Sequence, residues 1–151
     1  MSEAAQAMMA RWCWAVIVFG VLLIGAVSPV TDAPSRALLA IMGGVHSPID
    51  APLRFAVALM GAVTLGWGLT LLAVTSVSHR LDTPVACSLW RRVTVAVVVW
   101  YVVDSMASIA TGFALNAVSN TVFVIAFAVI VGWSQVLRPD RGSTIADPRS
   151  A

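Results

Sequence analysis

The chain has 151 residues, of which 60% are hydrophobic and only 11% are charged. Soluble domains are about 45–50% apolar and about 25% charged, so this composition argues against a soluble enzyme or a disordered chain and predicts lipid as the main solvent. The net charge of +2 comes from arginines and acids spread along the chain. Without a basic cluster that could track phosphates, nucleic acid is not expected as a partner.

Four apolar runs are long enough to cross a bilayer, whose core needs about 20 residues of helix. They cover about residues 12–30, 53–77, 89–111 and 117–137. A shorter run at about residues 34–44 predicts an interfacial helix in the first, outer loop, because it is too short to cross. The expected fold is therefore all-α: a polytopic membrane protein with four transmembrane helices in an antiparallel bundle and one short extra helix.

The sequence predicts one domain and an orientation for it. Residues 1–137 form the expected transmembrane domain, and residues 138–151 read as a flexible cytoplasmic tail. The first loop holds only Arg36 and Arg54, whereas the other arginines precede the first span, lie in the second loop or lie in the tail. Because arginine is enriched in cytoplasmic segments, both termini are expected in the cytoplasm. The same arrangement puts four indole rings at cytoplasmic ends, where tryptophan favours the interface: Trp12, Trp14, Trp90 and Trp133.

A cleaved signal peptide over residues 1–30 is the competing interpretation of the first span. It would use Arg11 as its basic region and residues 16–25 as its apolar core. It is less favoured, because Glu3 lies in that basic region and the apolar run continues to Val30 without a clean small-residue cleavage site.

Residues 32–45 and 50–63 resemble each other, and each begins Asp-Ala-Pro with an arginine two positions later. This pattern is typical of a helix start, because a carboxylate caps free N–H groups and proline costs little in the first turn. We expect Asp32 and Asp50 to cap two helices. Shared helix-start chemistry explains the likeness more simply than a local duplication, and both explanations stay open.

The second predicted span carries small residues at every fourth position: Ala58, Ala62, Gly66 and Thr70. Ala128 and Gly132 form a shorter version in the fourth span. Small residues let helix backbones approach closely in lipid, where no hydrophobic force drives helices together. The stripe predicts packing within the bundle, with self-association as the alternative.

Asp104 is the one charged residue deep inside a predicted span, about 18 Å along the helix from Arg92. A lone carboxylate at that depth should face the bundle, accept hydrogen bonds or be protonated. Polar partners follow at helical spacing and in the next span: Ser105, Ser108, Thr111, Asn116 and Asn120. A tight hairpin between the third and fourth spans would gather these residues into one intramembrane polar cluster.

Two interpretations of this polar cluster remain open. It is a proton-linked or ion-binding site, since intramembrane acids commonly mark such paths. Alternatively, it is a hydrogen-bonded clamp that fixes the register of the hairpin, and this interpretation is favoured.

Motifs for cofactors and catalysis are not found in the sequence. His46 and His79 are expected on opposite membrane faces and cannot share a haem. Cys13 and Cys87 lack a C-x-x-C spacing and are expected to be reduced structural residues. His46 with Asp50 would supply only two metal ligands, so neither a metal nor a cofactor is expected.

Several short segments form a combined pattern over roughly residues 11–137: Leu53-Arg54-Phe55, Met60-Gly61, Gly66-Trp67-Gly68, Trp100-Tyr101, Asp104-Ser105, Thr111-Gly112, Leu115-Asn116 and Asn120. This pattern resembles a group of small bacterial integral membrane proteins with four helices. The resemblance implies the fold and a multi-pass location in the cell inner membrane. It supplies no activity.

Two classes of function follow from these features. A non-enzymatic accessory or scaffold subunit, within a larger membrane complex or self-associated, is favoured because so short a chain has almost no mass outside the bilayer. The alternative is a small proton- or ion-linked transporter, or a channel-like homo-oligomer, that uses Asp104 with Asn116 and Asn120. An enzyme is not expected, because one acid without histidine or metal ligands does not supply the set of groups that an active site needs.

Overall fold

The structure is a computed structural model that describes residues 2–43 and 49–137. These residues are 85% helix and contain no strand, so the all-α prediction is confirmed. The helices in chain order are α1 (Glu3–Ile24), α2 (Ala33–Met42), α3 (Ala51–Ser78), α4 (Thr83–Ala110) and α5 (Ala114–Ser134). A short 3-10 helix, Gly25–Val27, extends α1.

Four segments are long and apolar enough to cross a membrane, which makes the chain a candidate multi-pass membrane protein: Glu3–Val27, Ala51–Ser78, Thr83–Ala110 and Ala114–Ser134. All four helices begin earlier than the apolar runs indicated, and α1 and α4 do so by several residues. The Ser2 hydroxyl accepts a hydrogen bond from the Ala5 amide at 3.3 Å, so α1 starts in the polar segment before Arg11. Good helix formers extend a helix beyond its apolar stretch, and an apolar run therefore sets a minimum helix length.

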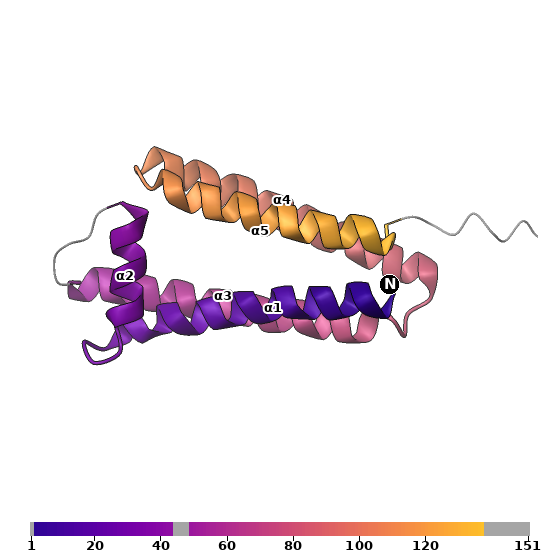
Figure 1. The fold of residues 1–151 in the computed structure, drawn as a ribbon, viewed down its shortest axis with the longest axis horizontal. Coiled ribbons are helices and arrows are strands. Elements are labelled where there is room, and N and C mark those ends of the chain that lie inside the picture. The colour runs from indigo at the N-terminus through magenta and orange to yellow at the C-terminus, as the bar shows by residue number, and fades with distance from the viewer. Residues whose placement is uncertain (1, 44–48, 138–151) are drawn as a thin grey trace, which may run out of the picture.

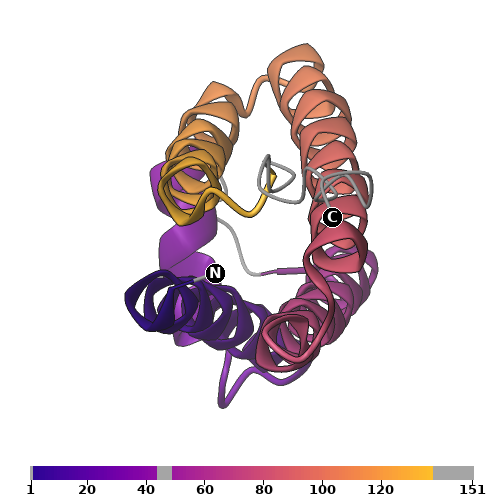
Figure 2. The same ribbon diagram turned by 90° about the vertical axis from the view of Figure 1, so that its right-hand side faces the viewer.

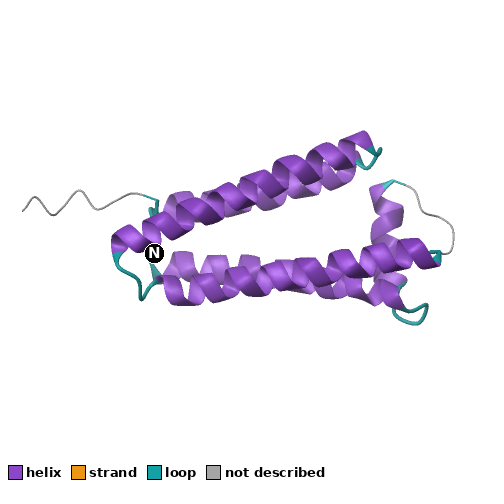
Figure 3. Cartoon of the chain, turned by 180° about the vertical axis from the view of Figure 1, so that it is seen from behind, coloured by secondary structure: helices purple, strands orange, loops and turns teal. Residues whose placement is uncertain are grey.

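The four long helices associate as two pairs. α1 and α3 lie side by side along most of their length, and α4 and α5 form the second pair (Figure 1). The pairs approach each other at the end that carries the N-terminus and diverge toward the other end, where α2 lies crosswise (Figures 1 and 3). Viewed along the helices, the ribbons surround a common axis, and α5 is the neighbour of α1 (Figure 2).

Glycines set the close approach of α1 and α3. A Cβ atom added to Gly20 would lie 2.6 Å from the Leu65 amide nitrogen, and one added to Gly61 would lie 2.6 Å from the Ile24 amide nitrogen. Gly68 likewise leaves room for Ile17. These neighbours are largely backbone atoms that no change of rotamer can move, so larger residues would push the helices apart.

An aromatic cluster joins the two helix pairs. The Trp12 ring contacts Trp67, Phe123 and Phe127 at centroid distances of 5.9, 6.1 and 5.6 Å, and Trp67 contacts Trp100 at 5.0 Å. The Trp12 indole also donates a hydrogen bond to the Phe123 carbonyl at 3.1 Å. Since the indole belongs to α1 and the carbonyl to α5, this bond fixes one pair against the other.

The expectation of an interfacial belt of four tryptophans is wrong for two of them. Trp12 is 7% exposed and Trp90 is 0% exposed, and both belong to the core. Both rings lie on helix faces that pack against the core, whereas Trp14, two residues beyond Trp12 on α1, lies on an outer face. Trp14 and Trp133 are exposed, as belt residues would be.

Candidate functional site

A tight turn between α4 and α5 positions the polar residues of these two candidate spans. Gly112 has a φ of +87°, a conformation that side chains other than glycine rarely adopt. The turn is closed by a hydrogen bond from the Phe113 amide to the Ser108 carbonyl at 2.8 Å. The hairpin therefore brings the last turns of α4 against the first turns of α5.

Asp104 on α4 accepts hydrogen bonds from two asparagines of α5. The Asn120 amide donates to Oδ2 at 3.1 Å, and the Asn116 amide donates to Oδ1 at 3.5 Å. Asn116 also donates to the Ser108 hydroxyl at 2.8 Å, while that hydroxyl donates to the Asp104 carbonyl at 2.7 Å. We call Asp104, Ser108, Asn116 and Asn120 the hairpin cluster.

Every member of the hairpin cluster bonds to another member, and Asn120 and Ser108 are buried. Two of the predicted polar residues do not join it. Ser105 is buried, and its hydroxyl has no hydrogen-bond partner among the described residues. The Thr111 hydroxyl bonds to the Ala107 carbonyl of its own helix at 2.8 Å. Asp104 forms no ion pair within residues 2–43 and 49–137.

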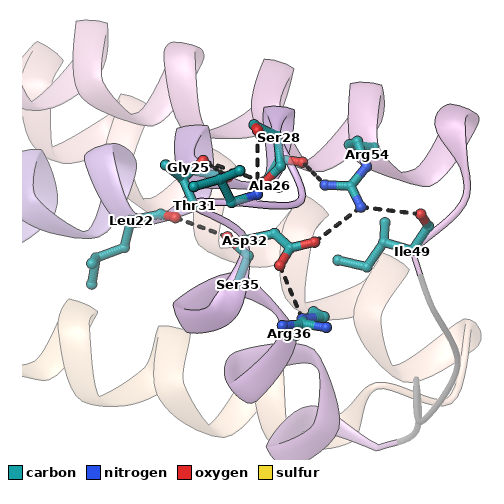
Figure 4. Close-up of polar contacts among 11 residues, drawn as sticks. Leu22, Gly25, Ala26, Ser28, Thr31, Asp32, Ser35, Arg36, Ile49 and Arg54 are labelled. Atoms are coloured by element: carbon teal, nitrogen blue, oxygen red, sulfur yellow. Dashed lines mark hydrogen bonds and ion pairs between the residues drawn. The ribbon is translucent and has the colours of Figure 1, made fainter.

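A second polar site, which the sequence did not indicate, lies at the end of the molecule that carries α2 (Figure 4). Asp32 is 2% exposed, and its carboxylate pairs with Arg54 at 2.9 Å and with Arg36 at 3.0 Å. Arg54 also donates to the Ala26 carbonyl at 2.7 Å and to the Ile49 carbonyl at 3.4 Å. The Arg54 guanidinium therefore ties the start of α3 to the end of the first span and to the start of α2.

The structure corrects the expected role of Asp32. Asp50 caps α3, accepting from the Leu53 amide at 3.0 Å, but Asp32 makes no side-chain cap bond. The arginine of the second repeat segment, Arg54, takes the Asp32 carboxylate instead. The shared Asp-Ala-Pro and arginine pattern was a usable signal for this pairing, but it could not show that the two segments touch.

The small residues that pack in the structure differ from the predicted stripe. Ala62, Gly66 and Thr70 are exposed, and Ala58 is half-buried. A Cβ atom on Gly66 would meet nothing within 4 Å, and the same is true of Gly132 on α5. The expectation that this stripe packs α3 within the chain is therefore wrong, because α3 presents its other small face, with Gly61 and Gly68, to α1.

The cysteines and histidines form no cluster within the part of the chain that the structure describes. Cys13 and Cys87 are both buried and free. The Gln6 amide contacts His79 Nδ1 at 3.2 Å, which places the start of α1 beside the end of α3. No group of three or more His, Cys, Asp or Glu side chains that could hold a metal ion occurs among the described residues, and His46 lies outside them.

Comparisons with protein-family models, with curated proteins and with solved structures find no match to this chain.

Proposed function

We propose that the chain is a four-span integral membrane protein that acts as a non-enzymatic accessory or scaffold subunit. The observation that carries this proposal is that the polar side chains of the hairpin cluster form hydrogen bonds with one another. Both oxygens of the Asp104 carboxylate accept hydrogen bonds from amides of the neighbouring helix. Groups bound to one another in this way hold helices in register.

The loops support the same proposal. The segments that join the helices include residues 28–32, 79–82 and 111–113, and none of them is long enough to form a domain outside the bilayer. The apolar side chains that face outward on α3, α4 and α5 offer their surface to lipid or to other spanning helices. Action through helix contacts fits this distribution better than chemistry in a water-filled site.

The proposal includes an antiparallel bundle in a bacterial inner membrane, with both termini in the cytoplasm. Arg11 and Arg80 lie at the end that carries the N-terminus, where the Gln6 and His79 contact joins α1 to α3. Arg36 and Arg54 lie at the opposite end, beside α2, which would rest at the outer interface. Most arginines of the sequence lie before the first span, in the second loop or in the tail. This excess favours the cytoplasm for the end that carries the N-terminus. The resemblance to small bacterial four-helix proteins supports the choice of membrane.

Purification from native membranes in a gentle detergent tests the scaffold proposal. We expect the tagged chain to retain a defined membrane subunit or a second copy of itself. The exposed small residues of α3 are the expected contact, so Gly66→Leu should release the partner. Leu69→Ile, at another exposed position of α3, is the matched control and should retain it. A monomer that retains no subunit in wild-type form would overturn the proposal.

A proton- or ion-linked transporter is the second candidate. The observation that favours it is that Asp104 has no cationic partner among the described residues, and acidic side chains inside spanning helices commonly mark proton or ion paths. Flux through liposomes that contain the wild-type chain and disappears with Asp104→Asn would establish this candidate and remove the scaffold as the sole function.

A further inference from the structure

The arginines of the described residues divide into two groups. Arg36 and Arg54 pair with Asp32, and Arg91 donates to the Leu137 carbonyl at 3.2 Å. By contrast, Arg11, Arg80 and Arg92 are exposed and form no hydrogen bond or ion pair with any residue that the structure describes. These three belong to the helix ends near the N-terminus, so that end presents three arginines that are not held by an ion pair with any described residue.

Arg92 borders a shallow, widely open groove on the first turns of α4, formed by the surface of this one helix. The groove is lined by Pro84, Val85, Ser88, Leu89 and Arg92. Its walls are mostly apolar, and Ser88 and Arg92 supply its polar side chains. These two residues are one helical turn apart, about 6 Å along the axis.

The groove continues into an apolar track on the same face of α4. Val95 and Val99, three and seven residues beyond Arg92, are 62% and 57% exposed. Val103 continues this face at 63% exposed. α4 therefore presents, in order from its N-terminus, a hydroxyl, a guanidinium and a line of valines that runs toward the middle of the helix.

We propose that this face of α4 binds an anionic phospholipid. Arg92 holds the phosphate by charge-assisted hydrogen bonds, the Ser88 hydroxyl bonds to the polar headgroup, and the acyl chains follow Val95 and Val99. The charge complementarity of the unpaired arginines with an anionic headgroup selects this occupant over a neutral lipid. The acids near this end, Glu3 and Asp82, form no ion pair with Arg92. This inference goes beyond the scaffold proposal and does not depend on it.

Native mass spectrometry of the purified full chain tests the proposal, with equal amounts of phosphatidylglycerol and phosphatidylcholine in the detergent. We expect the wild-type chain to retain phosphatidylglycerol preferentially. Arg92→Gln should lower that retention at least about tenfold, because it removes the charge-assisted hydrogen bond to the phosphate in addition to one positive charge. Ser88→Phe, which fills the groove without a change in charge, should also lower it. Arg80→Gln makes the same change in charge at the same end, outside the groove, and should alter retention less than about twofold.

Three results would overturn the proposal. Equal retention of the two lipids would remove the charge selection, and equal loss in Arg80→Gln and Arg92→Gln would show diffuse attraction without a site. A dimer that Ser88→Phe disrupts, with lipid retention unchanged, would identify a second copy as the occupant of the groove.

Discussion

Replacing Gly61 with alanine adds one methyl group between α1 and α3. In the present structure that Cβ atom would lie 2.6 Å from the Ile24 amide nitrogen, 2.7 Å from the Gly20 carbonyl oxygen and 2.8 Å from the Leu23 Cβ. Nonbonded heavy atoms prefer separations of about 3.5–4.0 Å, so the helices must separate by about 1 Å. Two of the three contacts are backbone atoms, and the strain cannot be relieved by a change of rotamer.

Overpacking of this kind costs about 1–3 kcal/mol, and we expect Gly61→Ala to lower the free energy of unfolding by that amount. Gly66→Ala is the matched control on the same helix, because its Cβ atom would meet nothing within 4 Å. Reversible unfolding in mixed micelles, followed by tryptophan fluorescence, measures both variants. Equal stability of Gly61→Ala and Gly66→Ala would refute the packing of α1 against α3. A larger loss of stability in Gly66→Ala would instead support packing through the small-residue stripe that the sequence predicted.

Four further substitutions, at three positions, test the polar contacts by the same unfolding measurement. Asp32→Ala leaves the Arg54 guanidinium, only 18% exposed, without its carboxylate, and should cost about 3–5 kcal/mol, whereas no loss would show that the pair is unimportant. Asp104→Leu should cost about 1–3 kcal/mol, because it leaves the buried Asn120 amide without its acceptor. Asp104→Asn should cost clearly less, because its amide oxygen still accepts, and the reverse order would contradict the clamp. Trp12→Phe loses the hydrogen bond to the Phe123 carbonyl and should cost about 1 kcal/mol. An unchanged stability would show that this bond does not stabilise the fold.

The sequence predicted the local features of this fold well. Apolar runs marked all four long helices, because helix length and hydropathy are read directly from neighbouring residues. The gathering of Asp104 with Asn116 and Asn120 was also predicted. It follows from helical spacing and one tight turn at Gly112, which are both local properties of the chain.

Contacts between segments far apart in the chain could not be predicted from the sequence. α3 carries small residues on two faces, and nothing in their spacing says that Gly61, and not Gly66, meets α1. The pairing of Arg54 with Asp32 requires the chain between them to fold back through α2, so each residue alone fitted a simpler role. Trp12 was assigned to the interface because the apolar run begins there, but its ring lies on the face of α1 that packs against α3 and α5.

The central claim is that the hairpin cluster holds helices together and carries no ion. Proton and cation flux through liposomes reconstituted with the full chain tests it most directly, with Asp104→Asn as the paired sample. The account predicts that wild type and variant both match the leak of empty liposomes. A wild-type flux that Asp104→Asn abolishes would contradict it.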